Sequence, residues 1–183
     1  MEEVSKLAAE DLIFIDESGA NLSFCRGYAR AIGGNRVKYA CPYPRGNKYT
    51  VIGAVSVASV EAALYGEWSA DGEIFLEFVK RQLVPQLSYG KVVIVDNVSF
   101  HKVIGVKEAI EETGARLFFL PPYSPDLSPI ELMWSKIKTV LRKISPRTRP
   151  QFKKAIRVAF AEIAGKDLVS WFKHCGYNNI STN

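Results

Sequence analysis

Short apolar runs alternate with segments of helical periodicity along most of this chain. The runs at residues 11–18 and 91–95 are continuous, which is typical of strands that are covered on both faces. A shorter run at 116–120 predicts a further strand. A β-branched run at 49–57 and a weaker run at 60–68 are joined by a short link, which predicts an antiparallel hairpin.

Apolar residues recur at helical spacing between and after the last three of these strands, as they do in helices that bury one face. Asp71 suits the N-cap of the first helix, and Gly114 suits the C-terminal end of the second. Strand and helix then alternate, which predicts parallel pairing through right-handed crossovers. The predicted helices cover residues 71–87, 103–114, 129–144, 150–165 and 168–175.

The predicted fold class is therefore α/β, with a five-stranded mixed sheet flanked by helices and further helices at the C-terminus. We expect the strand that ends at Asp16 to be central, with the strand that ends at Asp96 beside it and the hairpin on its other side. The length predicts one domain over residues 1–183, with 146–183 as a helical extension. Residues 20–48 show no clear period, and so long a loop is usually functional or disordered.

Composition excludes several other classes of protein. The chain has 183 residues, of which 48% are hydrophobic, and it can bury a sizeable core. It has no apolar run of about 18 residues, and its acidic N-terminus lacks the apolar region of a signal peptide. The three widely spaced cysteines, Cys25, Cys41 and Cys175, argue against a disulfide framework or a zinc site. We therefore expect a cytoplasmic protein without membrane contact.

The net charge of +5 is modest, but the charges are segregated along the chain. Residues 132–157 include nine Lys or Arg and no acid, and residues 26–48 include six basic residues and no acid. The first 24 residues hold six acids and one Lys. Such segregation is typical of proteins that bind a polyanion, although two solvated basic surfaces would produce the same pattern.

A proline-rich loop precedes the third predicted helix in the stretch L-P-P-Y-S-P-D-L-S-P-I-E-L-M-W-S-K-I-K, residues 120–138. Its prolines make the loop stiff and prevent it from being helical. Ser128 then has the position of an N-cap, Pro129 that of the first helical residue, and Glu131 that of the third. Ser and Glu at this spacing form a capping box, so capping is one interpretation of Glu131.

Two aspartates upstream favour a catalytic interpretation of Glu131. Asp16 and Asp96 each end a predicted strand, and parallel neighbours place such residues at one edge of the sheet, where open α/β sheets bind ligands. The helix that begins near Glu131 can reach the same edge. Three carboxylates in one crevice repel one another, and divalent cations relieve that repulsion because they prefer oxygen ligands. Two such ions can activate an attacking oxygen and stabilise the leaving oxygen in a displacement at phosphorus.

Three motifs now indicate a family: F-I-D-E-S-G around Asp16, V-D-N-V-S-F-H-K around Asp96, and the loop and helix start that end at Lys138. With 34 residues between Asp96 and Glu131, residues 11–145 resemble the catalytic domain of DDE transposases, in the bacterial insertion-sequence branch of the mariner superfamily. The resemblance implies a ribonuclease H-like fold and cut-and-paste chemistry on DNA that depends on Mg²⁺ or Mn²⁺, with two ions.

The resemblance implies that Asp16, Asp96 and Glu131 are the acids that bind the metal ions. Asn97 would orient Asp96 or make a turn, and Ser128 would support the helix start. His101 would contact phosphate or water near the ions, or would be a packed histidine. Trp134 is predicted to belong to the apolar face of its helix, with Ile130, Met133, Ile137, Leu141 and Ile144. The candidate DNA contacts are Arg26, Arg30, Arg36, Lys38, Arg45, Lys48, His101, Lys102, Tyr123, Ser124, Lys138, Arg142 and Lys143.

The main functional hypothesis is a transposase catalytic domain that hydrolyses a DNA phosphodiester and then joins the freed 3′-hydroxyl to target DNA. Its expected partners are double-stranded transposon ends and target DNA, with a homodimer assembled on the DNA at the nucleoid of a bacterium. A stand-alone ribonuclease H-like endonuclease and an inactive DNA-binding remnant are the alternatives, and the presence of all three acids disfavours the remnant. The helix-turn-helix domains that family members carry at their N-termini are absent here, so these residues are not expected to recognise specific DNA ends alone.

Overall fold

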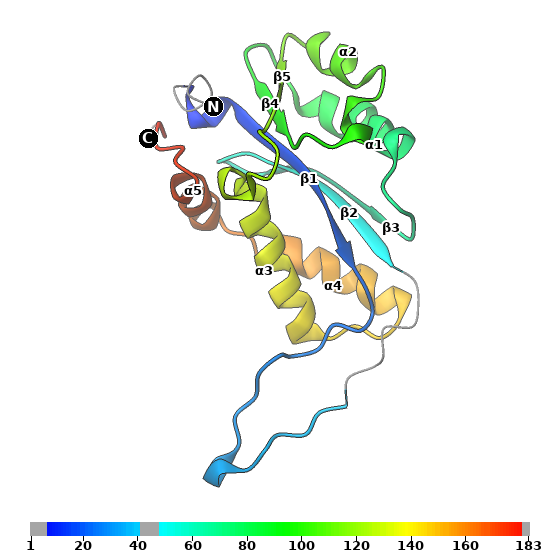
Figure 1. Cartoon of the computed structure of the whole chain (residues 1–183), viewed down its shortest axis with the longest axis vertical. Coiled ribbons are helices and arrows are strands. Elements are labelled where there is room, and N and C mark those ends of the chain that lie inside the picture. The colour runs from blue at the N-terminus through cyan, green and yellow to red at the C-terminus, as the bar shows by residue number, and fades with distance from the viewer. Residues whose placement is uncertain (1–6, 41–47, 181–183) are drawn as a thin grey trace.

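A five-stranded mixed sheet forms the centre of the protein in the computed structural model, which describes residues 7–40 and 48–180 (Figure 1). The strands are β1 (Leu12–Ala20), β2 (Tyr49–Val55), β3 (Val60–Gly66), β4 (Val92–Val95) and β5 (Arg116–Phe119). Their order across the sheet is β3-β2-β1-β4-β5, so β1 is central. β1 pairs antiparallel with β2 and parallel with β4, which confirms the predicted sheet.

The register places the two aspartates at the same level of the sheet. The last parallel pair of β1 and β4 joins Ile15 to Val95, and Asp16 and Asp96 are the next residue of each strand. The prediction that Asp16 ends its strand is wrong, because β1 continues to Ala20 while it pairs with β2. From Asp16 onward, β1 therefore pairs with β2 alone, because its pairing with β4 ends at Ile15.

Helices cover both faces of the sheet and leave the residues of β1 buried up to Ile15. Leu12 and Phe14 share one apolar cluster with α3, α4 and α5, whereas Ile13 and Ile15 share a second cluster with α1 and α2. This arrangement explains why the run shows no alternation of polar residues. The helices are α1 (Gly72–Phe78), α2 (Val106–Glu111), α3 (Pro129–Ile144), α4 (Arg149–Ala161) and α5 (Gly165–His174).

The predicted helix over 71–87 exists, but its geometry changes along its length. The side chain of Asp71 accepts a hydrogen bond of 2.9 Å from the backbone N–H of Ile74, which is the predicted N-cap. α1 then continues into a π-helical turn over Val79–Leu83 and a 3-10 turn over Val84–Gln86.

The two C-terminal helices contribute large side chains to the core of the sheet. Phe152 of α4 stacks on Tyr49 of β2, with 3.9 Å between ring centroids and 19° between ring planes. Phe172 of α5 meets Phe14 of β1 edge to face at 5.5 Å. Both phenylalanines have no exposed surface. The segment predicted as a helical extension thus closes one face of the sheet.

An arm of residues 21–40 follows β1 and projects from the body of the protein (Figure 1). The base of the arm is fixed by Arg147, which lies between α3 and α4. Its Nη1 donates hydrogen bonds to the backbone oxygens of Leu22 and Phe24, at 3.0 and 2.7 Å. The long loop predicted here is therefore attached to the body at its start.

A cysteine in this arm corrects one prediction from the sequence. Cys25 is disulfide-bonded, whereas the cysteine spacing argued against a disulfide framework and for a reducing cytosol. Wide spacing in sequence was the basis of that prediction, and wide spacing does not by itself prevent a disulfide. Arg45, a candidate DNA contact, lies outside the described residues.

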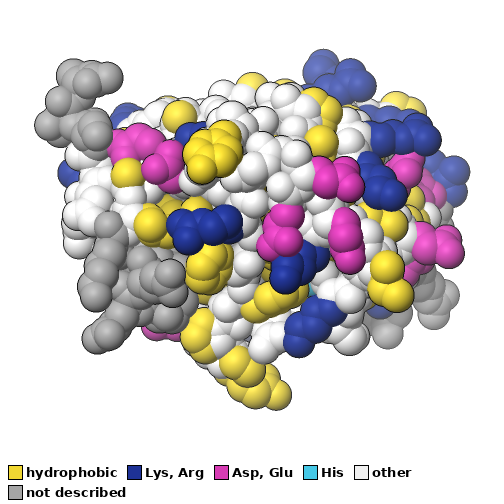
Figure 2. Space-filling view, turned by 90° about the horizontal axis from the view of Figure 1, so that it is seen from above, with side chains coloured by type: hydrophobic (Ala, Val, Ile, Leu, Met, Phe, Trp, Pro, Cys, Tyr) yellow, Lys and Arg dark blue, Asp and Glu magenta, His cyan; other side chains and the backbone are white. Residues whose placement is uncertain are grey.

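The surface shows both signs of charge at the end that carries α1, α2 and β5. Figure 2 looks onto this end from above, and Lys or Arg side chains are interspersed there with Asp and Glu. Within residues 7–40 and 48–180, no helix has the length and apolar character needed to cross a membrane.

The stacked pair of Tyr49 and Phe152 gives a test of whether α4 belongs to the folded core. Phe152→Ala should lower the free energy of unfolding by about 3–5 kcal/mol, because it leaves a cavity under β2. Lys153→Ala, at an exposed position of the same helix, should change it by less than about 0.5 kcal/mol. Urea denaturation measures both values, and equal small effects would mean that α4 only rests on the surface.

Candidate active site

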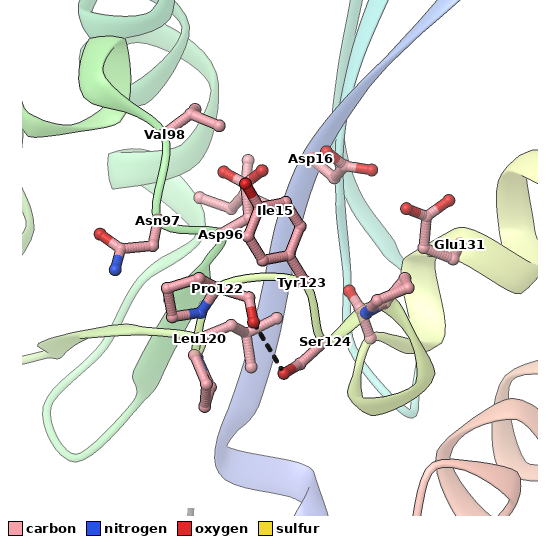
Figure 3. A pocket seen from close by; sticks show the side chains of 13 residues that line it. Ile15, Asp16, Asp96, Asn97, Val98, Leu120, Pro122, Tyr123, Ser124 and Glu131 are labelled. Atoms are coloured by element: carbon pink, nitrogen blue, oxygen red, sulfur yellow. Dashed lines mark hydrogen bonds between the residues drawn. The ribbon is translucent and has the colours of Figure 1, made fainter.

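A cavity of about 410 Å³ opens at the sheet edge where β4 ends, and Asp16, Asp96 and Glu131 all line it (Figure 3). β1 provides the first aspartate, the second directly follows β4, and the first turn of α3 provides the glutamate. The proline-rich loop between β5 and α3 forms one wall, with Tyr123 and Ser124 among its lining residues. The three acids therefore share one cavity, at the sheet edge where the sequence predicts a crevice.

Asp16 lies on the α3 face of the sheet and is held from that side. The indole Nε1–H of Trp134 donates a hydrogen bond of 2.8 Å to Asp16 Oδ2. Burial raises the pKa of Asp16 to about 7, and the negative charges of Glu17 and Glu131 add to this rise, whereas the bond from Trp134 opposes it. The carboxyl group therefore changes charge near neutral pH in the metal-free protein.

Asp96 is held from the opposite face of the sheet by a buried histidine. His101 has no exposed surface, and its Nδ1 lies 2.6 Å from Asp96 Oδ1. Its Nε2 lies 3.1 Å from Oε2 of Glu17, which neighbours Asp16 in β1. One imidazole ring thus bridges a carboxylate of β1 and a carboxylate that follows β4.

The two carboxylates keep this histidine charged. Burial acts against protonation, but the hydrogen bonds with Asp96 and Glu17 and their negative charges outweigh it and raise the pKa of His101 to about 9. For Asp96, burial acts to raise the pKa, and the hydrogen bond and charge of His101 outweigh burial, so the pKa falls below its usual range. An imidazolium with two carboxylate partners is the result.

Glu131 extends from the first turn of α3 toward the cavity and is exposed. Ser128 is the N-cap residue as predicted, but its side chain accepts no capping hydrogen bond. The backbone N–H of Glu131 instead bonds to the backbone oxygen of Ser128 at 3.1 Å. Figure 3 shows the carboxylate of Glu131 facing that of Asp16. The structure therefore gives no support to a capping box at this helix.

The donor set suits a hard divalent cation, which prefers carboxylate oxygens. The pKa of Asp16 is raised mainly by burial, with smaller contributions from the charges of Glu17 and Glu131. Among the residues that the structure describes, no group of three or more His, Cys, Asp or Glu side chains is close enough to hold one ion together. The three acids thus share a cavity without meeting at a single point.

The loop wall holds a backbone conformation that is rare outside glycine. Tyr123 has a φ of 57° and a fully exposed side chain at the rim of the cavity. Such conformations cost about 1–3 kcal/mol and cluster at functional sites. The prolines on either side restrict the loop and help to hold this residue in place.

The other predicted site residues divide into those at the surface and those that are covered. His101 is fully buried, which does not fit a DNA contact and does fit the alternative of a packed histidine. Asn97 is exposed at the cavity, and no hydrogen bond joins it to Asp96 among those of the described residues. Lys138 is half-buried on α3. The candidate contacts that are exposed are Arg26, Arg30, Arg36, Lys38, Lys48, Lys102, Tyr123, Arg142 and Lys143, whereas Ser124 is half-buried.

Two residues near the site have roles that reasoning from the sequence missed. Trp134 was placed in the core, which is correct, but its bond to Asp16 was not foreseen. Glu17 was noted only as part of a motif, although it is one of the two partners of His101. The position of Trp134, nearly one helical turn after Glu131, was the only signal for the first of these.

The pKa values of Asp16 and His101 predict how the stability of the metal-free protein depends on pH. The folded protein holds a proton on Asp16 up to about pH 7 that the unfolded chain loses near pH 3.8, so stability falls over this range as pH rises. His101 holds its proton up to about pH 9 rather than 6.5, so stability falls further between these values.

Chemical denaturation in EDTA from pH 4 to 9 measures this decline, at about 1.4 kcal/mol for each unit of pKa shift. Asp16→Asn should remove the fall below pH 7 and keep the fall above it. A parent protein whose stability rises between pH 5 and 8 would contradict both assignments.

The fold is similar to that of solved Mos1 transposase structures. A pre-cleavage Mos1 transpososome matches with a TM-score of 0.76 and 14% identity, over 96% of this chain and 55% of that chain. The Mos1 mariner paired-end complex with Mn matches with a TM-score of 0.73 and 14% identity, over 96% and 55%. The catalytic domain of Mos1 mariner transposase matches with 0.69 and 13%, over 96% and 81%.

These matches confirm the predicted ribonuclease H-like fold, and this chain spans about half the length of the first two structures. A comparison with curated protein sequences finds no match. The sequence profile of the DDE superfamily endonucleases matches residues 11–153, a range that contains all three cavity acids. The chain therefore belongs to the family of DDE superfamily endonucleases.

Proposed function

We propose that this chain is the catalytic domain of a transposase, which cleaves DNA phosphodiester bonds and joins the freed 3′-ends to target DNA. The observation that supports it most is the cavity shared by Asp16, Asp96 and Glu131 in a member of the DDE endonuclease family. Mos1 has been solved in a strand transfer complex and in paired-end complexes with Mn and with Mg. The mariner-type loop motif favours the same activity over a stand-alone endonuclease.

Asp16, Asp96 and Glu131 would hold Mg²⁺ or Mn²⁺ in this cavity. Bound there, two such ions supply an activated attacking oxygen and stabilise the leaving oxygen at phosphorus. The chain's own contribution is to set the direction of each carboxylate. His101 fixes Asp96 from one face of the sheet, and Trp134 fixes Asp16 from the other.

The DNA backbone would follow α3 away from the cavity. Glu131, Ser135, Lys138 and Arg142 form one stripe along this helix, so the stripe turns from acidic to basic with distance from the cavity. At its far end, the guanidinium of Arg142 lies 5.7 Å from the ring centroid of Phe24, at the base of the arm. The basic end of α3 therefore touches the base of the arm, and the arm carries the exposed Arg26 and Arg30 beyond this point.

Two copies of the chain would assemble on a pair of transposon ends, as a homodimer on DNA. In support, Mos1 transposase has been solved in a paired-end complex with the left transposon end. Membership of the bacterial insertion-sequence branch rests on the motifs alone. A strand-transfer assay with a pre-cut end separates a transposase from a simple endonuclease, because only the former joins the end to a second DNA.

Removal of one acid tests the metal site directly. Glu131→Gln and Asp16→Asn should abolish Mn²⁺-dependent DNA nicking. In thermal melts, metal should stabilise the parent by RT ln(1 + [L]/Kd), about 2.7 kcal/mol at a hundredfold excess over Kd, and should stabilise these variants much less. Without metal, each variant should be at least as stable as the parent, because a repelling charge is gone.

Ser128→Ala is the control for the helix start. Its side chain makes no capping bond, so the substitution should leave the metal-induced shift intact. Equal metal-induced shifts in Glu131→Gln and the parent would remove Glu131 from the metal site.

Charge reversal on α3 tests the DNA path. Lys138→Glu and Arg142→Glu should weaken binding on all sequences alike and reduce the slope of log K against log salt by about 0.9 for each phosphate that the protein no longer neutralises. Lys107→Glu, on α2 at the opposite face of the sheet, should leave both quantities unchanged. Fluorescence anisotropy between about 50 and 200 mM salt measures them, and a parent affinity that ignores salt would contradict the path.

A further inference from the structure

A buried tryptophan supports the carboxylate of Asp16 from behind the cavity. Trp134 is 2% exposed, and its Nε1–H donates to Asp16 Oδ2 at 2.8 Å. Trp134 is not among the residues that line the cavity, whereas Asp16 is. The indole therefore reaches the carboxylate from within the core and not through the cavity.

A glycine in the neighbouring strand makes the space that this indole occupies. Gly53 of β2 is the register partner of Asp16. A Cβ atom at Gly53 would lie 2.9 Å from Cη2 of Trp134 and 3.1 Å from Cε of Met133, closer than such atoms approach. The φ of Gly53 is not in the left-handed region, so its backbone does not require glycine. The requirement is for space beside Trp134.

Packing alone does not explain this arrangement. Phenylalanine at position 134 would fill most of the same volume, and it would need no polar partner. A buried indole N–H needs an acceptor, and the acceptor here is one oxygen of a carboxylate whose charge is already unfavourable. A carboxylate held in this way by Trp134, with the backbone of Glu17 as a further donor, has a restricted orientation at the cavity.

We propose that Trp134 is a positioning residue for Asp16: its N–H fixes Oδ2, Gly53 provides the space, and the carboxylate is oriented to bind a divalent cation. This inference rests on the proposed function, in which Asp16 holds the cation. Residues that bond to metal ligands typically change metal affinity by about 10–100-fold when they are replaced.

Trp134→Phe keeps an aromatic ring and removes the donor. We expect its Kd for Mn²⁺, measured by electron paramagnetic resonance of free Mn²⁺, to rise about 10–100-fold. Trp171→Phe, the same substitution at a half-buried position of α5, should leave the Kd for Mn²⁺ unchanged. A structural role alone would lower the unfolding temperature of Trp134→Phe without changing its affinity for Mn²⁺, and an unchanged Kd overturns the inference.

Gly53→Ala displaces the indole and keeps the donor. It should also raise the Kd for Mn²⁺ several-fold or more. The double variant Gly53→Ala with Trp134→Phe should bind Mn²⁺ no more weakly than the poorer single variant, because both substitutions remove the same bond to Asp16. Gly19→Ala is the matched control in β1, where a Cβ atom would have no neighbour within 4 Å. Additive effects of the two site substitutions would overturn the coupling of Gly53 to Trp134.

A measurement without metal keeps the inference testable if Trp134→Phe fails to fold. The sequence has three tryptophans, and the loss of one indole ¹H–¹⁵N signal in each of the variants Trp68→Phe and Trp171→Phe identifies the signal of Trp134 by elimination. Asp16→Ala removes the acceptor, so this signal should shift and its hydrogen exchange should speed up several-fold. An unmoved signal overturns the inference. If Asp16→Asn binds Mn²⁺ as tightly as the parent, the proposed metal site fails instead, and the inference fails with it.

Discussion

Burial of a carboxylate among other carboxylates, at the end of the β1–β4 pairing, is the constraint on which the site depends. Asp16 and Glu17 are neighbours in a central strand, and Asp96 and Glu131 line the same cavity as Asp16. Burial and like charges raise the pKa of Asp16 to about 7, so the fold works against the charged form it would need for binding a cation. Two donors from outside the cavity act on these acids: Trp134 offsets part of the cost at Asp16, and His101 pairs with Glu17 and Asp96.

The two donors approach from opposite faces of the sheet because successive residues of a strand point to opposite sides. Asp16 points toward α3 and meets Trp134, whereas Glu17 points toward the α1 face and meets His101. The imidazolium of His101 then reaches Asp96 as well, which ties the end of β4 to β1 beyond their last backbone pair. The sheet edge is thus held together by side chains where its backbone pairing stops.

Much of the fold could be predicted from the sequence because its signals are local. A continuous apolar run indicates a strand covered on both faces, and β1 and β4 are such strands. The end of β1 was misplaced at Asp16 because a polar residue was taken to end the strand, whereas pairing with the hairpin continues to Ala20. Ile144 was assigned to the buried face of α3 by its spacing, but it is 42% exposed where the helix ends. For the candidate site, local signals were enough to bring three acids to one cavity, because strand ends and a helix start are visible in the sequence. The bonds from Trp134 to Asp16 and from His101 to Glu17 could not be predicted, because they span 118 and 84 residues and depend on the packed core.

Helix α3 links the stability of the fold to the geometry of the cavity. α3 places Trp134 in the core and Glu131 at the cavity, about one helical turn apart, so that a buried and an exposed residue of the same helix both approach Asp16. Any change that shifts α3 against β2 therefore moves a core side chain, the donor to Asp16 and the third acid together. Gly53 permits the close approach of α3 to β2, because a Cβ atom at this position would clash with Trp134 and Met133. The geometry of the cavity is in this sense set by the same contacts that close the core.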